Sequence, residues 1–174
     1  MDNTVVKKAL SYALGSDIHE VWRATRKRAD GTFEPRIKKS TDEAWNASHG
    51  TDEVDIANCT FEQLPSNWQY ENLEAARVAI EMVFDKTMSE EQISHEESEE
   101  MASTIHDEYL KRNVWAQSDP KLGVPFALLS QEEQDKDRAQ LGPAQAKVQA
   151  YMDGKIDVEA ICEQYGLPTS LRTK

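Results

Sequence analysis

The chain has 174 residues, the length of one domain or of two small ones. Acidic residues outnumber basic ones by 32 to 20, so the formal net charge is −12, and only 33 residues are Leu, Ile, Val or Phe. Two cysteines exclude a disulfide-based scaffold, and no apolar run reaches the roughly 18 residues that a membrane span requires. We therefore expect an acidic, soluble protein of a reducing, cytoplasmic compartment with no membrane partner.

The charge is unevenly distributed along the chain. Residues 1–40 hold nine basic and five acidic residues, a net charge of +4, whereas residues 41–174 carry −16. Seven of the bases fall between Arg23 and Lys39. The overall acidity argues against general nucleic-acid binding, which needs a basic surface. A small anionic or nucleotide-like ligand at the basic segment stays open, and so does pairing of this segment with the protein's own acidic helix.

The N-terminal third is predicted to contain two helices and then an irregular region. Apolar residues at helical spacing predict a helix over residues 4–14 that ends at Gly15. A second helix is expected from there to about Arg28. Residues 32–38 alternate in polarity as a short edge strand does, and residues 41–53 have the composition of a loop.

The middle of the chain is predicted to form two long helices. Ser66 and Gln69 have the spacing of a capping box, so a helix is expected from there to about residue 85. Ser89 and Gln92 repeat this spacing and are expected to open a second, acidic helical region.

The C-terminal part is predicted to consist of shorter helices. One begins with the capping sequence at Ser130 and runs to Leu141, where Gly142-Pro143 stops it. Another spans residues 144–152, Asp157 caps a last one, and the end of the chain from Thr169 is expected to be frayed. These patterns together predict a mainly α fold with at most a short β segment.

Two segments resemble each other and predict an internal repeat. Ile18-His19-Glu20 recurs as Ile105-His106-Asp107 after 87 residues, and the Phe-x-x-Leu of Phe61 recurs at Phe126 after 65. The first copy therefore contains a 22-residue insertion. Each copy would be a helix, a connection and a capped helix, and two such pseudo-symmetric copies can bury their apolar faces around a twofold axis.

These residues resemble the ryanodine-receptor-type repeat (RyR) domain. Ile18–Trp22 matches the family's Ile-His-Glu-x-Trp-like helix start, and Val124–Leu129 with Asp137-Arg138 matches its Val-Pro-aromatic stretch and acidic helix. In the second copy Tyr109 replaces the Trp.

The resemblance implies how the chain is organised and what it does. It implies an RyR-like domain over residues 1–143, with repeats at about 10–85 and 100–141, and a C-terminal helical extension over 144–174. Such modules are interaction surfaces in channels, and in bacteria and phages they occur in proteins proposed to sense nucleotide-like ligands. The implied function is a non-enzymatic binding module without a cofactor, which holds an anionic ligand or docks a partner protein.

The basic segment Arg23–Lys39 and the irregular residues after it lie between the helices of the first copy, where the insertion falls. This region, called the basic insertion below, is the centre of the predicted ligand site. Guanidinium groups bind phosphate and indole rings stack on bases. A helix-borne His can hydrogen-bond to a ligand or, in the alternative reading, bond a carbonyl of the protein itself. The predicted ligand-binding residues are His19, Trp22, Arg23, Arg26, Arg36, Lys38, Trp45, Gln69 and Asn72.

No local motif indicates catalysis or a metal site. His95 and Glu99 have i, i+4 spacing, but there is no His-Glu-x-x-His, and Cys59 lacks a recognisable catalytic context. An enzyme is therefore the least supported class. The main alternative is an acidic accessory or structural protein of phage type, which acts through protein–protein interaction and whose helix over Glu90 to Glu108 covers a basic partner surface.

Overall fold

Most of the described chain, residues 1–169, is helical in the computed structural model. The predicted mainly α fold with a short β segment is therefore confirmed. The α-helices are α1 (Asn3–Ala24), α2 (Glu43–His49), α3 (Ser66–Met88), α4 (His95–Arg112), α5 (Gln131–Arg138), α6 (Leu141–Met152) and α7 (Val158–Gln164). The shorter elements are the strands β1 (Ile37–Lys39) and β2 (Glu53–Asp55) and the 3₁₀ helices η1 (Phe61–Gln63), η2 (Val114–Ser118) and η3 (Phe126–Leu128).

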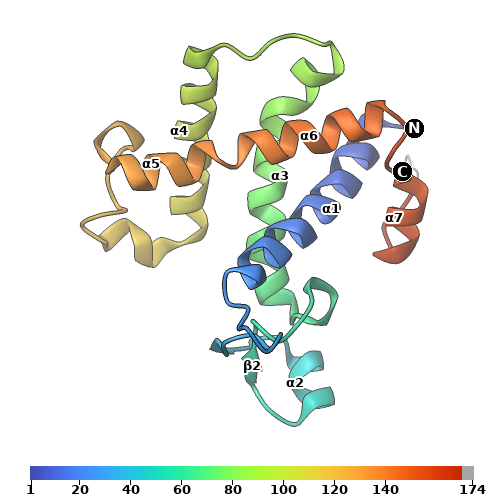
Figure 1. Ribbon diagram of the computed structural model, residues 1–174, viewed down its shortest axis with the longest axis vertical. Coiled ribbons are helices and arrows are strands. Elements are labelled where there is room, and N and C mark those ends of the chain that lie inside the picture. The colour runs from blue at the N-terminus through green and yellow to red at the C-terminus, as the bar shows by residue number, and fades with distance from the viewer. Residues whose placement is uncertain (170–174) are drawn as a thin grey trace.

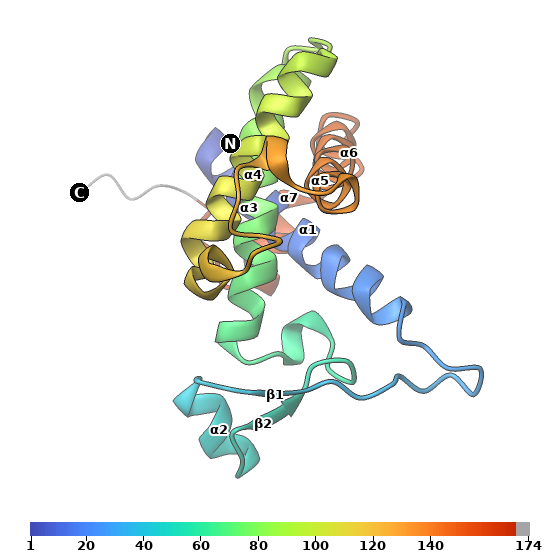
Figure 2. The same cartoon turned by 90° about the vertical axis from the view of Figure 1, so that its left-hand side faces the viewer.

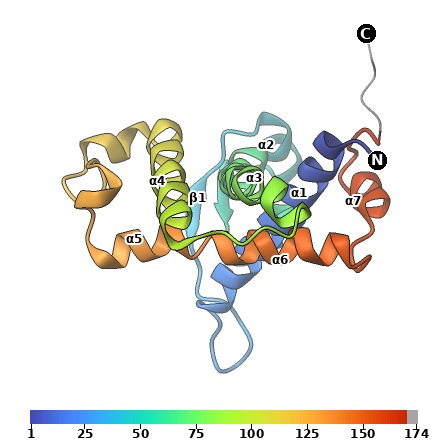
Figure 3. The same ribbon diagram turned by 90° about the horizontal axis from the view of Figure 1, so that it is seen from above.

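Helix α3 lies at the centre of the molecule, where α1 and α6 cross it (Figure 1). Helix α4 packs on another side of α3, and α5 and α6 follow each other almost in line (Figure 3). The largest fully buried side chains among the described residues are Phe61, Phe84, Leu10, Leu14 and Ile80, and all of these except Phe61 belong to the core between the crossing helices. Each such side chain contributes about 1.5–3 kcal/mol to folding through burial. Among residues 1–169, none of the helices has both the length and the apolar character that crossing a membrane would need.

Helix α1 runs without a break through Gly15, so the prediction of two separate helices was wrong. A Cβ atom on Gly15 would lie 3.4 Å from backbone atoms of Asn72 and Leu73, so glycine lets α1 approach α3 closely. The apolar stripe of Leu10 and Leu14 is buried against that helix. This packing outweighs the roughly 1 kcal/mol that glycine costs inside a helix.

The segment predicted as a loop over residues 41–53 contains helix α2. The carboxylate of Asp42 accepts a hydrogen bond from Trp45 N at 3.0 Å, and its other oxygen accepts one from Ser66 N at 2.9 Å. One side chain thus caps both α2 and α3, and these bonds hold the pKa of Asp42 below its ordinary value. Ser66 is the first residue of α3 and forms no capping box with Gln69.

Strand β1 lies slightly later than the alternation over residues 32–38 predicted. Ile37 pairs with Asp55 and Lys39 with Glu53 in an antiparallel two-stranded sheet. Pro35 precedes this pairing, as expected for a residue without a backbone N–H. The segment between α1 and β1 extends away from the helices (Figure 2).

Two helix boundaries in the second half also differ from prediction. Helix α4 begins at His95 and is capped by Ser94, with Glu97 completing the capping box, so the expected cap at Ser89 was wrong. Gly142-Pro143 does not stop a helix but lies in the first turn of α6, where a missing N–H costs nothing. The predicted domain boundary between residues 143 and 144 falls inside α6. The expected caps at Ser130 and Asp157 are present, whereas the expected fraying after Thr169 lies outside the described residues.

Candidate functional site

A cavity of about 700 Å³ lies between α1, α3, α4 and α6. Its volume falls in the range of roughly 300–1,000 Å³ typical of small-molecule sites. The wall is mostly apolar. Its apolar residues are Leu14, Ile18 and Val21 of α1, Ala75 and Val78 of α3, Ile105 of α4, and Ala139, Pro143, Ala146 and Ala150 of the α5–α6 region.

The charged side chains of the wall are paired with each other. Lys147 Nζ lies 2.6 Å from Asp17 Oδ2, and Arg112 Nη2 donates to Glu71 Oε1 at 3.3 Å. Asn113 donates a second hydrogen bond to the same Glu71 oxygen. Two cations face two anions, so the wall carries no net charge and offers no free cation to an anionic ligand.

Two residues that line the cavity each have a polar atom that is buried without a partner in the protein. These atoms are Nε of Arg112, a donor, and Oε1 of Gln140, an acceptor. A buried polar group without a hydrogen bond costs about 1–3 kcal/mol. Both atoms are enclosed by protein, so a molecule in the cavity does not reach them in this arrangement.

A second cavity of about 450 Å³ adjoins the first, and Tyr109 and Gln140 line both. Its wall contains His106 and Asp137, which are both buried. The Nε2–H of His106 donates to the carbonyl of Val124 at 2.9 Å, while Nδ1 lies 3.4 Å from Asp137 Oδ2. Burial raises the pKa of Asp137 to about 6. A protonated Asp137 carboxyl can donate a hydrogen bond to Nδ1 of His106, so the two side chains can share one proton.

Burial also raises the pKa of the Tyr109 hydroxyl, and the nearby carboxylates of Glu71, Glu133 and Asp137 act in the same direction. The neutral phenol is therefore the stable form of Tyr109 in the wall between the two cavities.

The two similar segments make the same hydrogen bonds. His19 donates from Nε2 to Cys59 O at 2.8 Å, as His106 does to Val124 O. Each acceptor carbonyl lies two residues before the Phe that begins a 3₁₀ helix. Through these matched contacts each histidine holds the connecting segment of its own copy. This corresponds to the alternative in which the histidine bonds a carbonyl of the protein itself.

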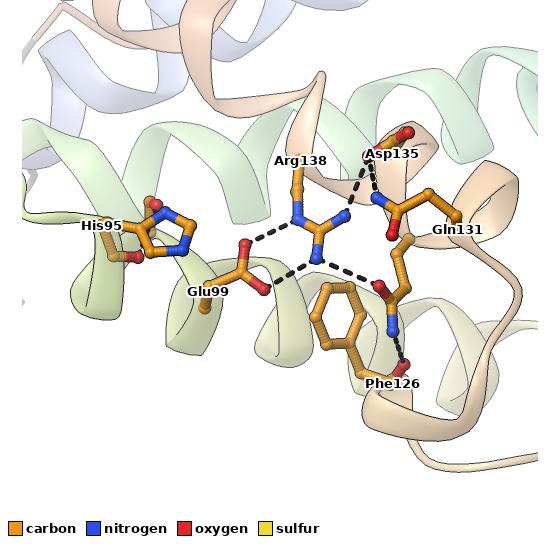
Figure 4. A network of polar contacts seen from close by, with 8 residues as sticks. His95, Glu99, Phe126, Gln131, Asp135 and Arg138 are labelled. Atoms are coloured by element: carbon orange, nitrogen blue, oxygen red, sulfur yellow. Dashed lines mark hydrogen bonds and ion pairs between the residues drawn. The ribbon is translucent and has the colours of Figure 1, made fainter.

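The capped helix of each copy also makes a matched contact. Gln69 donates to Phe61 O and Gln134 to Phe126 O, both at 2.9 Å. Figure 4 shows the second of these bonds beside Arg138, which binds Glu99 through two nitrogens. The copies differ where Asn72 of the first corresponds to Asp137 of the second.

The predicted basic residues mostly bond to the insertion itself. Arg23 donates from Nε to Ala57 O at 2.9 Å and stacks over Phe33. Arg26 donates to the carbonyls of Glu34 and Pro35 and lies over the Trp22 ring. The guanidinium groups thus fold the insertion through cation–π contacts and carbonyl bonds.

The remaining predicted residues bond to other parts of the protein or are exposed. Trp45 donates to Gln63 O and stacks on His49, Lys38 lies over the Trp68 ring, and Arg36 is exposed. Of the nine predicted residues, Asn72 alone lines the large cavity. The structure does not bring Asn72 together with the basic insertion in one pocket.

Residues 1–169 contain no group of three His, Cys, Asp or Glu side chains placed to hold a metal ion. In the predicted i, i+4 pair of His95 and Glu99, the carboxylate is occupied by Arg138, which lowers the pKa of Glu99 (Figure 4). Burial raises the pKa of the Cys59 thiol, which makes it a weaker nucleophile.

Comparisons of this chain with protein-family models, with curated proteins and with solved structures found no match. The cavity residues Tyr109, Arg112 and Gln140 were not predicted from the sequence. The available signal was the apolar stripe of Ile18 and Val21, which is typical of a core face. The structure instead leaves Val21 68% exposed at the cavity.

Proposed function

We propose that the protein is a non-enzymatic binding module whose four-helix cavity holds a small molecule. The observation that carries this proposal is the cavity of about 700 Å³, whose wall is mostly apolar and whose charged side chains are paired with each other. An apolar wall supplies the affinity through burial, and a few polar atoms orient the ligand.

The histidine contacts favour binding over catalysis. Both ring nitrogens of His106 are engaged, one by Val124 and one by Asp137, so neither is free to touch a substrate. A general base needs a nitrogen within reach of the proton that it removes. His19 is buried with its Nε2 on Cys59, which assigns it the same supporting role.

The matched contacts of the two copies support the proposed internal repeat, on which the proposed relation to the RyR domain depends. The basic and aromatic residues of the insertion are the basis for the narrower prediction of an anionic, nucleotide-like ligand there. There, however, Arg23 and Arg26 would have to release their carbonyl partners before they could bind phosphate. The four-helix cavity needs no such rearrangement, so we favour it as the ligand site.

A thermal-shift screen of small molecules against three forms of the protein tests the proposal. In Ala75→Phe a ring fills the cavity, whereas Ala160→Phe adds the same ring on the exposed surface of α7. We expect compounds that raise the melting temperature of the wild type and of Ala160→Phe but not of Ala75→Phe. Equal shifts in folded Ala75→Phe, confirmed by circular dichroism, or no shift with any compound, would refute the proposal.

A second candidate function is the docking of a protein partner. Val114 and Trp115 are 67% and 63% exposed immediately after the acidic helix α4, where apolar side chains of this size favour an interface. Glu96 and Glu100 are exposed on α4, whereas Glu97 and Glu99 are held by Lys86 and Arg138. This candidate predicts a partner whose binding weakens in Trp115→Ser and, at low salt, in the double change of Glu96 and Glu100 to Gln.

A further inference from the structure

Resting on the proposed function, we infer that the ligand is an uncharged, mostly apolar molecule that binds between the two copies of the repeat and contacts both of them. The inference depends on where the cavity lies relative to the two copies and on how its charged side chains are paired. The cavity lies among α1, α3, α4 and α6, so its place in the repeat follows from which copy each helix belongs to.

The two copies match over more of the chain than their short motifs. Shifted by 65 residues, η1 coincides with η3, and α3 (Ser66–Met88) covers residues 131–153. Helices α5 and α6 together span Gln131–Met152 and follow each other almost in line (Figure 3). Shifted by 87 residues, the last residue of α1, Ala24, falls one position before Arg112, the end of α4. The first copy therefore consists of α1, η1 and α3, and the second of α4, η3, α5 and α6.

The two copies pack on each other in a reciprocal way. Helix α3 of the first copy packs against its counterpart α6. Helix α1 also packs against α6, and its counterpart α4 packs against α3. Reciprocal contacts of this kind arise where two similar units are related by an approximate twofold axis. The cavity lies among the four helices that make these contacts, so it belongs to the interface between the copies.

Matching positions of the two copies line this cavity. Three such pairs are Ile18 with Ile105 at the offset of 87, and Ala75 with Gln140 and Val78 with Pro143 at the offset of 65. A molecule that fills the cavity therefore touches equivalent surfaces of both copies. Because most of the wall is apolar, affinity is expected to grow with the apolar surface that the molecule buries.

The four charged side chains that line the cavity determine the charge of the ligand. Asp17 of α1 lies 2.6 Å from Lys147 of α6, and Glu71 of α3 lies 3.3 Å from Arg112 of α4. Each ion pair thus joins an acid of the first copy to a base of the second. A charged ligand would lose its hydration without gaining a partner, or would have to break one of these pairs. A neutral molecule leaves both pairs in place.

Three probes that share one apolar body and differ in charge test the ligand class. Isothermal titration of the full-length protein at pH 7 would compare the neutral 6-phenylhexan-1-ol with the anion 6-phenylhexanoate and the cation 6-phenylhexylammonium. We expect the alcohol to bind at least 10-fold more tightly than either ion. Binding of an ion as tight as that of the alcohol, or tighter, would overturn the inferred ligand class while leaving the cavity as the proposed site.

Two variants test whether the ion pairs cause this selectivity. Asp17→Asn leaves Lys147 without its partner, so the carboxylate probe should bind at least 5-fold more tightly than to the wild type. Lys147→Met leaves Asp17 unpaired, and the ammonium probe should gain by a similar factor. Asp153→Asn is the matched control, because it frees Lys155 outside this cavity and should change the affinity for each probe by less than 2-fold. No gain in either variant, or an equal gain in the control, would overturn the inference.

Binding across the interface requires a signal from each copy. In an isotope-filtered NMR experiment, the phenyl protons of the alcohol should show intermolecular NOEs to the methyl groups of both Ile18 and Ile105. Ile161 of α7 lies outside this cavity and should show none. NOEs to only one of the two cavity isoleucines would contradict contact with both copies.

The outcomes also distinguish the inference from the proposed function. If none of the three probes binds but other compounds distinguish Ala75→Phe from the wild type in the thermal-shift screen, the cavity binds ligands and the inferred ligand class is wrong. If none of the probes binds and no compound distinguishes these two forms, both proposals are wrong.

Discussion

The Nδ1 atom of His106 lies 3.4 Å from Oδ2 of Asp137, and this buried pair joins α4 to α5. The other ring nitrogen of His106 donates to Val124 just before η3, so one imidazole connects three segments of the second copy. Glu133 raises and Lys136 lowers the pKa of Asp137, but the dominant cause of its shift to about 6 is burial.

This pair predicts a specific dependence of stability on pH. The unfolded chain releases the Asp137 proton near the ordinary pKa of 3.8, whereas the folded protein keeps it until about pH 6. Between these values the folded state binds more protons, so the free energy of unfolding contributed by Asp137 falls as pH rises. The shift of about two units corresponds to about 3 kcal/mol, fully present below pH 4 and lost above pH 6.

Urea unfolding of the wild type, Asp137→Asn and Asp107→Asn between pH 4 and pH 7.5 measures this contribution. Asp137→Asn introduces the residue that the first copy carries at the matching position, Asn72, and it removes the titrating group. The wild type should lose stability relative to Asp137→Asn as pH rises, whereas the exposed control Asp107→Asn should follow the wild type. Parallel curves for all three proteins would contradict the assignment.

The matched glutamines predict equal effects in the two copies. Gln69→Leu and Gln134→Leu each remove one hydrogen bond to a Phe carbonyl, so each should lower the free energy of unfolding by about 1–2 kcal/mol. Gln92→Leu, at an exposed position between α3 and α4, is the control and should change it by less than about 0.5 kcal/mol. A large effect in only one copy would show that the two contacts are not equivalent in energy.

Two glycines predict opposite effects of the same substitution. A Cβ atom on Gly123 would lie 2.2 Å from Gln117 O and 2.7 Å from Gln117 C, so Gly123→Ala must displace backbone. Such crowding costs about 1–3 kcal/mol. Gly142 of α6 has open space around it, and Gly142→Ala should be neutral or stabilise by up to about 1 kcal/mol. Thermal unfolding of both variants checks the contrast, which equal melting temperatures would contradict.

The sequence predicted most helices because their signals are local. Ser130 and Asp157 cap the helices that follow them, as their spacing indicated. The predictions failed where a distant residue decided the outcome. Asp42 caps α3 from 24 residues away, and Gly15 stays helical because α3 packs against it.

The site was harder to predict for the same reason. The recurrence of His19 and Gln69 as His106 and Gln134 is visible in the sequence, and the structure gives both pairs matched contacts. Nothing local marks Arg112, because an arginine at a helix end usually complements the helix dipole. Its place in the cavity wall depends on how α4 packs beside α3, where Arg112 pairs with Glu71, and no local pattern encodes this packing.

The most direct test of the central claim is an NMR titration with a compound that raises the melting temperature of the wild type in the thermal-shift screen, following isoleucine methyl and tryptophan indole signals together. The four-helix cavity predicts saturable shifts of the Ile18 and Ile105 δ1 methyl signals, while the indole N–H of Trp45, bonded to Gln63 in the basic insertion, stays unchanged. Shifts of the Trp45 indole with unchanged isoleucine methyls would contradict this account and place the ligand on the insertion.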